Sequence, residues 1–166
     1  MSTETKTIIP EEDGVRHINI YSKGATELGK MLSNFYKFPI MTKDGKFMSV
    51  EGYWYWLAIS ETHPRREEFR KLYGYNAKKL GQEILKEISV DERRWEENFE
   101  EKILLAILYK FKRNTQLITD DLKTLPFEHY YNYGGKAVDC YKRYPWMIDG
   151  ITKMRDVLVK RMEEQK

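Results

Sequence analysis

The sequence predicts an α+β fold that is mostly helical, in a single domain with a small antiparallel sheet near the N-terminus. Residues 17–21 alternate in polarity, as a short strand does, and Asp44-Gly45 is typical of a two-residue hairpin turn. After residue 49, apolar side chains recur mainly at helical spacing. The chain has 166 residues, enough for one domain with a core and too few for two comfortable ones.

The N-terminal part divides into a tail and the expected sheet. Residues 1–16 are polar and acidic, and we expect them to form a flexible tail before a domain over residues 17–166. A second strand is expected at residues 38–41, and the chain returns through residues 46–48 after the turn. These strands make up the predicted antiparallel sheet.

Helices are expected over most of the remaining chain. Ser49 is a good N-cap for a helix that ends near Glu61, before Pro64. The other helices are predicted at residues 65–73, 77–88, 89–113, 115–123 and 146–162. The long one starts from Ser89-Val90-Asp91-Glu92, which has capping-box spacing. An apolar stripe runs along it, of a kind that more often packs in a core than lines a cofactor site: Trp95, Phe99, Ile103, Ala106 and Lys110.

Composition and charge argue against several classes of protein. The net charge of +3, from 29 basic and 26 acidic residues, permits an anionic ligand but does not indicate a large nucleic-acid interface. The single cysteine, Cys140, excludes an internal disulfide and is expected to be structural, because no Cys-His-acid arrangement is legible. No apolar run approaches the ~20 residues that span a bilayer, and the N-terminus lacks a signal-peptide pattern. We therefore expect a cytoplasmic protein without a membrane partner.

Glu51 is the first candidate catalytic residue. It falls in the first turn of the helix capped by Ser49, where the helix dipole favours an ionised carboxylate. Trp54 and Tyr55 follow at i+3 and i+4, on the same face. An ionised acid beside aromatic rings can stabilise an oxocarbenium-like centre or orient a water molecule against it. The alternative, more common for such a helix taken alone, is that Glu51 only supports the helix start.

Two further residues carry polar groups suited to a ligand. The side-chain amide of Asn34 could bind sugar hydroxyls or phosphate, or it could hold its own loop as an Asx turn. Lys23 could meet an anion, or, if desolvated, attack a sugar C1 carbon as an amine nucleophile. An exposed lysine without such a role is the commoner outcome.

The stretch from Glu128 to Lys136 (EHYYNYGGK) is the densest polar and aromatic segment, within a loop predicted from residue 126 to 135. Tyr131 and Tyr133 could stack on a base or ribose, and Gly134 allows close backbone approach to a ligand. The alternative is a turn with tyrosines packed around it. The glycine spacing is not a nucleotide-binding fingerprint, and the three histidines lack metal-ligand spacing, so no metal and no cofactor are expected.

Several ordered segments resemble the NADAR/YbiA-like superfamily over roughly residues 18–158. The matching segments are Leu32-Ser33-Asn34-Phe35-Tyr36, Ser49-Val50-Glu51 with Tyr53, Ala77-Lys78-Lys79-Leu80-Gly81, Trp95 followed by Lys110-Phe111 and Asn114, and Leu122, Thr124 and Glu128. Each alone is weak, but five in order across one domain are specific.

The resemblance implies an N-glycosidase that cleaves the bond between a sugar and a base. The implied substrates are ADP-ribosylated guanine, in a nucleotide or nucleic acid, and a small ribosylamino phosphate of the riboflavin pathway. Glu51 is the implied principal catalytic residue, and Lys23 is our candidate for the lysine-imine route known in the family. Substrate-binding positions follow from the motifs and the aromatic segments: Asn34, Phe35, Tyr36, Trp54, Tyr55, Trp95, Tyr131, Tyr133 and Gly134.

The sequence also departs from the family pattern. Gly52 and Tyr55 stand where the family usually has His and Gln, and the usual glycine-rich Trp-Gly tail motif is absent. The tyrosine-rich segment occupies that region and can mark a branch that removes ADP-ribose from nucleic acid. A non-catalytic module that binds ADP-ribose or a related nucleotide is the alternative that these departures favour.

Overall fold

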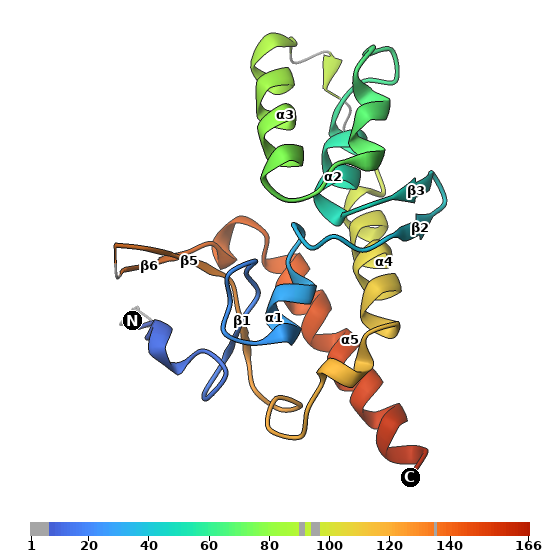
Figure 1. Ribbon diagram of the computed structural model, residues 1–166. Helices are drawn as coiled ribbons and strands as arrows, with labels where there is room; N and C mark the ends of the chain where they lie inside the picture. Colours follow the sequence, from blue (N-terminus) through green and yellow to red (C-terminus); the bar gives the residue numbers. More distant parts are fainter. Residues whose placement is uncertain (1–6, 90–91, 94–96, 135) are drawn as a thin grey trace. The chain divides into compact units, whose positions relative to one another are not determined.

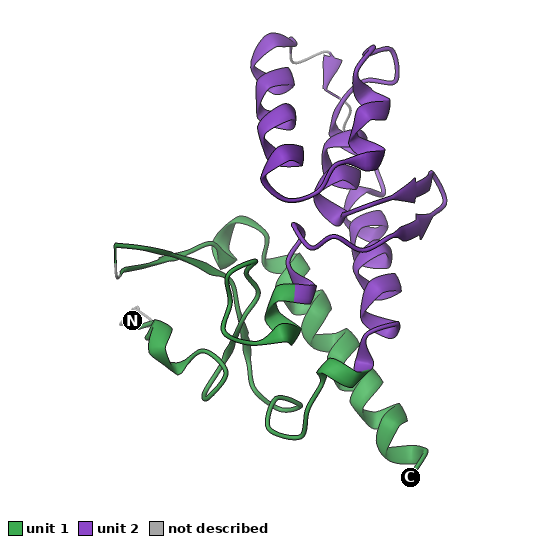
Figure 2. Ribbon diagram, in the orientation of Figure 1, with its two compact units in different colours: residues 1–30, 116–166 green, residues 31–115 purple. Residues whose placement is uncertain are grey.

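The computed structural model describes residues 7–89, 92–93, 97–134 and 136–166 (Figure 1). Within these residues helices predominate and three small two-stranded sheets are present, which confirms the predicted mostly helical α+β class. The chain divides into two compact units: residues 1–30 and 116–166 form unit 1, and residues 31–115 form unit 2 (Figure 2). The single domain over residues 17–166 stays a prediction.

Unit 2 is a helical unit with one β-hairpin. Its elements are β2 (Ile40–Thr42), β3 (Gly45–Phe47), α2 (Val50–Ala58), the 3₁₀ helix η2 (Arg66–Lys71), α3 (Gly74–Glu87) and α4 (Phe99–Lys112), while α1 (Glu27–Leu32) spans the boundary with unit 1. Ile40 pairs with Phe47 across the hairpin, and Gly45 has a φ of 107° in its turn. The hairpin confirms the predicted antiparallel sheet near the N-terminus.

Helix α2 is the centre of unit 2. Ser49 caps it as predicted, since its Oγ accepts a hydrogen bond from the Gly52 N–H at 2.9 Å. The helix packs against η2, α3 and α4. Gly81 of α3 allows the closest approach, because a Cβ there would lie 2.3 Å from a carbon of the Tyr55 ring. Tyr55 consequently packs between α2 and α3, with its other neighbours including the stacked ring of Phe69.

The predicted long helix over residues 89–113 is wrong at its start. Helix α4 begins at Phe99, whereas the Ser60 N–H donates to the Glu92 carbonyl and Ile59 forms a β-bridge with Arg93. This pairing with the chain after α2 holds Glu92 and Arg93 outside α4, so a tertiary contact prevails over the local capping signal. Residues 90–91 and 94–96, including Trp95, lie outside the described residues.

Unit 1 is assembled from both ends of the chain. Its elements are η1 (Pro10–Glu12), β1 (Ile18–Asn19), β4 (Phe127–Glu128), β5 (Tyr130–Tyr133), β6 (Lys136–Asp139), η5 (Tyr141–Arg143) and α5 (Pro145–Glu164). The strand predicted at residues 17–21 is thus present in part, but it pairs in parallel with β4 and not with the hairpin. Helix α5, predicted at residues 146–162, packs on β4 and η5.

Two other expectations for unit 1 are corrected. The aromatic segment is not a loop, because β5 and β6 pair in register as an antiparallel hairpin from Tyr130↔Asp139 to Tyr133↔Lys136. The helix expected at residues 115–123 is reduced to one 3₁₀ turn, η4 (Thr115–Leu117), followed by turns. Tyr131 and Tyr133 recur at the period of two that is typical of a strand. This period indicates a strand, although two glycines follow it and favour a loop.

Polar side chains fix the start of unit 1. Within the segment expected to be a tail, the carboxylate of Asp13 accepts the N–H groups of Asn19 and Ala25 at 2.9 and 2.8 Å. The amide of Asn19 bonds both the N–H and the carbonyl of Tyr130, and the Tyr130 hydroxyl lies 2.7 Å from His17 Nε2. These bonds tie β1 to β5 across more than a hundred positions of sequence.

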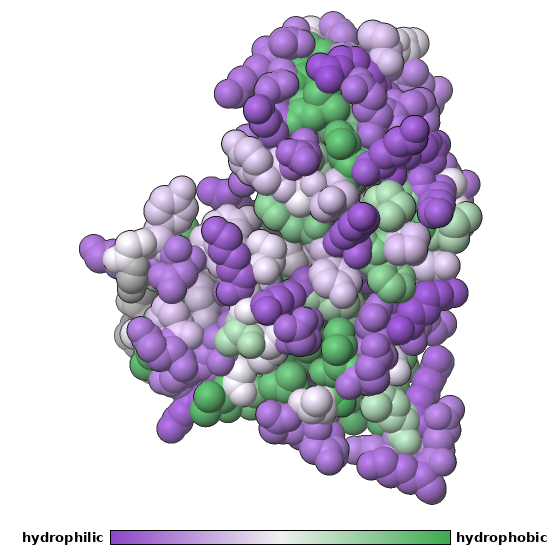
Figure 3. Space-filling model, in the orientation of Figure 1, coloured by the Kyte–Doolittle hydropathy of each residue, from purple (hydrophilic) through white to green (hydrophobic). Residues whose placement is uncertain are grey.

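Many charged side chains are exposed, although Arg66, Lys110, Glu128 and Arg155 are buried. On the face drawn in Figure 3, hydrophilic side chains cover much of the outer surface of each unit, and apolar side chains show in separate patches between them.

Cys140 is buried. Within the described ranges, no helix combines the length and the apolar character needed to cross a membrane.

Candidate active site

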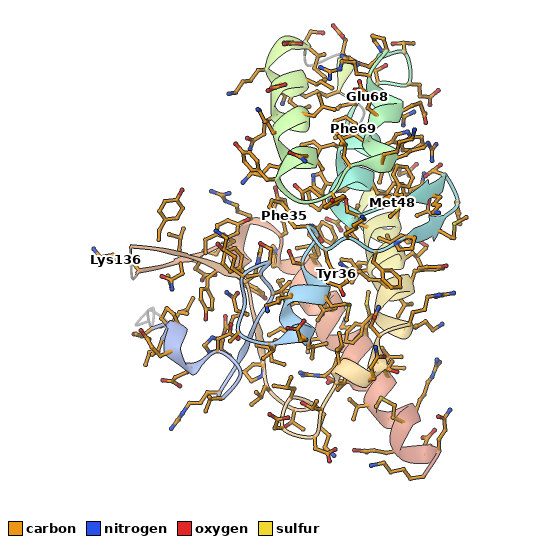
Figure 4. The ribbon with its side chains drawn as sticks, in the orientation of Figure 1. Phe35, Tyr36, Met48, Glu68, Phe69 and Lys136 are labelled. Atoms are coloured by element: carbon orange, nitrogen blue, oxygen red, sulfur yellow. The ribbon has the colours of Figure 1, made fainter. Side chains whose placement is uncertain are left out.

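The turn at residues 33–36 is anchored to three helices of unit 2. The carbonyls of residues 33, 34 and 35 accept hydrogen bonds from Lys110 Nζ of α4, the Glu51 N–H of α2 and the Gly74 N–H of α3, at 2.7, 2.9 and 3.1 Å. Within the turn, the Tyr36 N–H donates to the first of these carbonyls at 3.1 Å. Figure 4 labels Phe35 and Tyr36 in this turn. Three consecutive carbonyls thus fix the turn, and residues 34–36 remain partly exposed.

Glu51 lies beside this turn, in the first turn of α2. Burial raises the pKa of its carboxyl group to about 7, and the positive charges of Lys78 and then Lys110 oppose that rise. The helix dipole was expected to favour the ionised carboxylate, but desolvation outweighs it here. A carboxyl group with a pKa near neutrality can accept or release a proton under ordinary conditions, which suits a general acid or base.

Lys110 is the functional candidate that the sequence reasoning missed. Its side chain is fully buried, and its Nζ lies 5.9 Å from the centroid of the Tyr36 ring. Burial lowers the pKa of its amino group to about 7, and the nearby charge of Glu51 opposes that fall. Its place on the apolar stripe of α4 was a usable signal, because a lysine at a core position must find a partner.

Glu51 and Lys110 together form an acid–base pair inside unit 2. Their charges favour each other's ionised form, while burial of both favours the neutral forms. The two charges therefore act on each other within the site, and each opposes the effect of burial on the pKa of the other group. Ionisable groups whose pKa values are shifted in this way, beside a partly exposed turn, are typical of functional sites.

The structure places five of the predicted substrate-binding residues in unit 2 with Glu51. Asn34, Phe35 and Tyr36 form the anchored turn described above. Trp54 packs edge-to-face on Phe99, with ring centroids 4.7 Å apart. Tyr55 is buried against Gly81 and Phe69, so its ring contributes to the core.

Four further predicted site residues, Lys23, Tyr131, Tyr133 and Gly134, lie in unit 1, and Trp95 lies outside the described residues. Lys23 is exposed on the turn that follows β1. Tyr131 is half-buried, Tyr133 is 77% exposed, and Gly134 takes a φ of 55° at the tip of the hairpin. In the described part of the chain, no group of three His, Cys, Asp or Glu side chains could hold a metal ion.

A hollow of about 250 Å³ lies elsewhere on unit 2, between β2 and α4. Its lining includes Met41, Leu105 and Lys102, and the Lys102 ammonium is bound 3.0 Å from the Asp44 carboxylate. The Asp44 carboxylate also accepts the Tyr53 hydroxyl at 2.7 Å. None of the predicted site residues lines this hollow.

Among solved structures, the NMR structure of E. coli YbiA is similar to this chain. The match covers 90% of this chain and 92% of that chain, with a TM-score of 0.59 and 20% sequence identity. The chain has the YbiA fold. This confirms the fold that the sequence motifs implied. The sequence matches no family model and no curated protein, so the likeness to YbiA is one of three-dimensional arrangement.

Proposed function

We propose that the protein is an N-glycosidase that hydrolyses the bond between a base and the sugar of an ADP-ribosyl or ribosyl-phosphate group, with ADP-ribosylated guanine as its substrate. The observation that carries the proposal is the Glu51 carboxyl group, whose pKa is raised to about 7 beside an anchored turn. The YbiA fold supports it, and the three NADAR-like motif segments at residues 32–36, 49–53 and 77–81 all belong to unit 2. A cytoplasmic location fits this chemistry.

Glu51 would act at the anomeric carbon. In its ionised form it stabilises the positive charge that develops as the C1′–N bond to the base breaks, or it takes a proton from the attacking water. The water oxygen then bonds to C1′, and the base leaves with the bonding electron pair and a proton. An imine route through Lys23 stays a prediction.

The anchored turn would position the substrate. Lys110 holds the Ser33 carbonyl, and the Glu51 N–H holds the Asn34 carbonyl, so the backbone of the turn is fixed beside the start of α2. Phe35 and Tyr36 add partly exposed rings that can contact the base or the ribose. Because these groups are already held in place, less entropy has to be lost to orient the substrate in the transition state.

The test is mass spectrometry of the products formed from guanine-ADP-ribosylated DNA and, separately, from a riboflavin-pathway ribosylamino phosphate. Release of ADP-ribose from the DNA supports the proposal, and its loss in Glu51→Gln assigns the chemistry to that carboxyl group. Glu101→Gln, which removes an exposed carboxylate from α4, is the matched control and should keep full activity. Turnover of the small phosphate alone would place the protein in metabolism instead.

A non-catalytic nucleotide-binding module is the second candidate, favoured by the packing at two motif positions. A Cβ at Gly52 would lie 2.4 Å from the Phe69 carbonyl oxygen, so this position has no room for the usual polar side chain. Tyr55 is buried in the core. Calorimetry with ADP-ribose distinguishes the candidates: tight binding by both the parent protein and Glu51→Gln, without turnover of any glycoside, supports the module.

A further inference from the structure

The β5–β6 hairpin of unit 1 sorts its side chains by face. Because neighbouring residues of a strand point to opposite sides, Tyr131 and Tyr133 share one face. Their cross-strand partners are Val138 and Lys136, which therefore lie on the same face. The opposite face carries Asp139, paired with Tyr130. We call the first of these the tyrosine face.

Aromatic rings continue along the tyrosine face toward the base of the hairpin. The Tyr131 ring lies 5.3 Å from the ring of Tyr21 and 5.7 Å from that of His129, centroid to centroid. The His129 Nδ1 lies 2.8 Å from the Ile20 carbonyl oxygen, which fixes its ring. Tyr131 is therefore braced from two sides, whereas Tyr133, further along the strand, is 77% exposed.

Charges of both signs lie near the tyrosine face, since those of Asp139 and Arg143 both act on the His129 ring. Lys136 is exposed at the end of the hairpin, as Figure 4 shows, and Lys142 and Arg143 follow in η5 and are exposed. The carboxylate of Asp139, on the opposite face, accepts the Tyr141 N–H at 2.9 Å. The face therefore combines exposed aromatic surface with cations and keeps its nearest strand carboxylate on the other side.

We infer that the tyrosine face binds a single-stranded nucleic acid. Alternate residues of a strand are separated by about 6.6 Å, so Tyr131 and Tyr133 can each receive one unstacked base. Lys136 on the same face, and Arg143 near His129, would contact the phosphates between them. A duplex offers no free base faces for such rings. The inference rests on the hairpin alone and does not depend on catalysis by Glu51.

The test is fluorescence polarisation with a labelled oligonucleotide of about ten nucleotides, as DNA, as RNA and as the annealed duplex. We expect the single strands to bind about tenfold more tightly than the duplex. Tyr133→Ala should weaken single-strand binding about five- to a hundredfold, and Tyr133→Phe should preserve it. Lys136→Met should reduce the salt slope by about 0.7.

Matched controls lie in unit 2. Tyr75, 66% exposed on α3, and the exposed Lys79 give Tyr75→Ala and Lys79→Met, which should bind like the parent protein. Binding is measured on an unmodified oligonucleotide without turnover, so a failure of the proposed catalysis leaves this result readable. Absence of single-strand binding, equal affinity for duplex, or equal losses in Tyr133→Ala and Tyr75→Ala would overturn the inference.

Discussion

The anchored turn of unit 2 and the β5–β6 hairpin of unit 1 use polar and aromatic residues in opposite ways. In the turn, three carbonyls are engaged by three helices, and a buried lysine supplies one of the hydrogen bonds. In the hairpin, the tyrosine face exposes a ring and a lysine to solvent. The first arrangement costs desolvation and fixes geometry, as chemistry requires, whereas the second leaves surface available for contact.

The largest expected effect separates the two regions by activity. Glu51→Gln should lower kcat for release of ADP-ribose about 10²- to 10⁴-fold, since it removes the carboxylate at the reacting centre. Tyr133→Ala should leave kcat on a free ADP-ribosyl guanine nucleotide unchanged. Steady-state kinetics on the nucleotide checks both variants, and a fully active, folded Glu51→Gln would refute the proposed chemistry.

The second prediction concerns pH. A carboxyl group is ionised above its pKa, so activity that needs the Glu51 carboxylate should fall as pH drops below about 7. Lys110→Met removes a positive charge that lowers the pKa of Glu51. The acidic limb of the pH–activity profile should therefore move to higher pH. A move of one unit would reduce activity at pH 7 about fivefold.

Lys110→Arg is the matched control for the pH profile, because it keeps the positive charge. The profile should stay nearer to that of the parent protein in this variant. If Lys110→Met and Lys110→Arg have the same acidic limb in their pH–activity profiles, Lys110 acts on the turn through packing alone. That result would contradict the electrostatic coupling of Glu51 and Lys110. Circular dichroism would first establish that both variants are folded.

A pair of glycine substitutions compares the packing of the two regions. Gly81→Ala places a methyl group 2.3 Å from the Tyr55 ring and should lower the free energy of unfolding by about 1–3 kcal/mol. Gly134 has nothing within 4 Å of its Cβ position, so Gly134→Ala should cost only about 1 kcal/mol for its positive φ. Urea denaturation measures both, and the reverse order would contradict the described packing.

The smallest expected effect lies within unit 1. Tyr130→Phe removes the hydroxyl that lies 2.7 Å from His17 Nε2 and should cost about 1 kcal/mol in the free energy of unfolding. Tyr133→Phe removes an exposed hydroxyl and should cost nothing measurable. Equal stability of the two variants would mean that the buried hydrogen bond contributes no net stability.

Local signals in the sequence predicted much of unit 2. The Ser49 cap, the turn at Gly45 and the helical period of α2 and α3 depend on residues close in sequence, and the structure has each of them. The parallel pairing of β1 with β4 joins segments more than a hundred residues apart. No local pattern specifies such a partner, so the sequence indicated a strand without its neighbour.

The sequence predicted the acidic residue of the candidate site, Glu51, but not its buried amine, Lys110. The motif and the preceding N-cap indicate Glu51, whereas the helical period predicts only that Lys110 belongs to a core stripe. Periodicity indicates that a position is buried, but the carbonyl that satisfies a buried ammonium comes from the distant turn at Ser33. Similarly, Tyr55 lay on the expected face of its helix, but Gly81 made room for its ring in the core.

The division of the chain into a continuous and a discontinuous unit has a consequence for synthesis on the ribosome. Unit 2 is complete once residues 31–115 have emerged, but β1 of unit 1 must wait for β4, which is translated later. Residue 128 follows residue 19 by roughly 110 positions, which take on the order of ten seconds to translate at about 5–20 residues per second. During that interval the nascent chain exposes an unpaired segment with Ile18 and Ile20, both buried in the finished protein, to solvent and to chaperones.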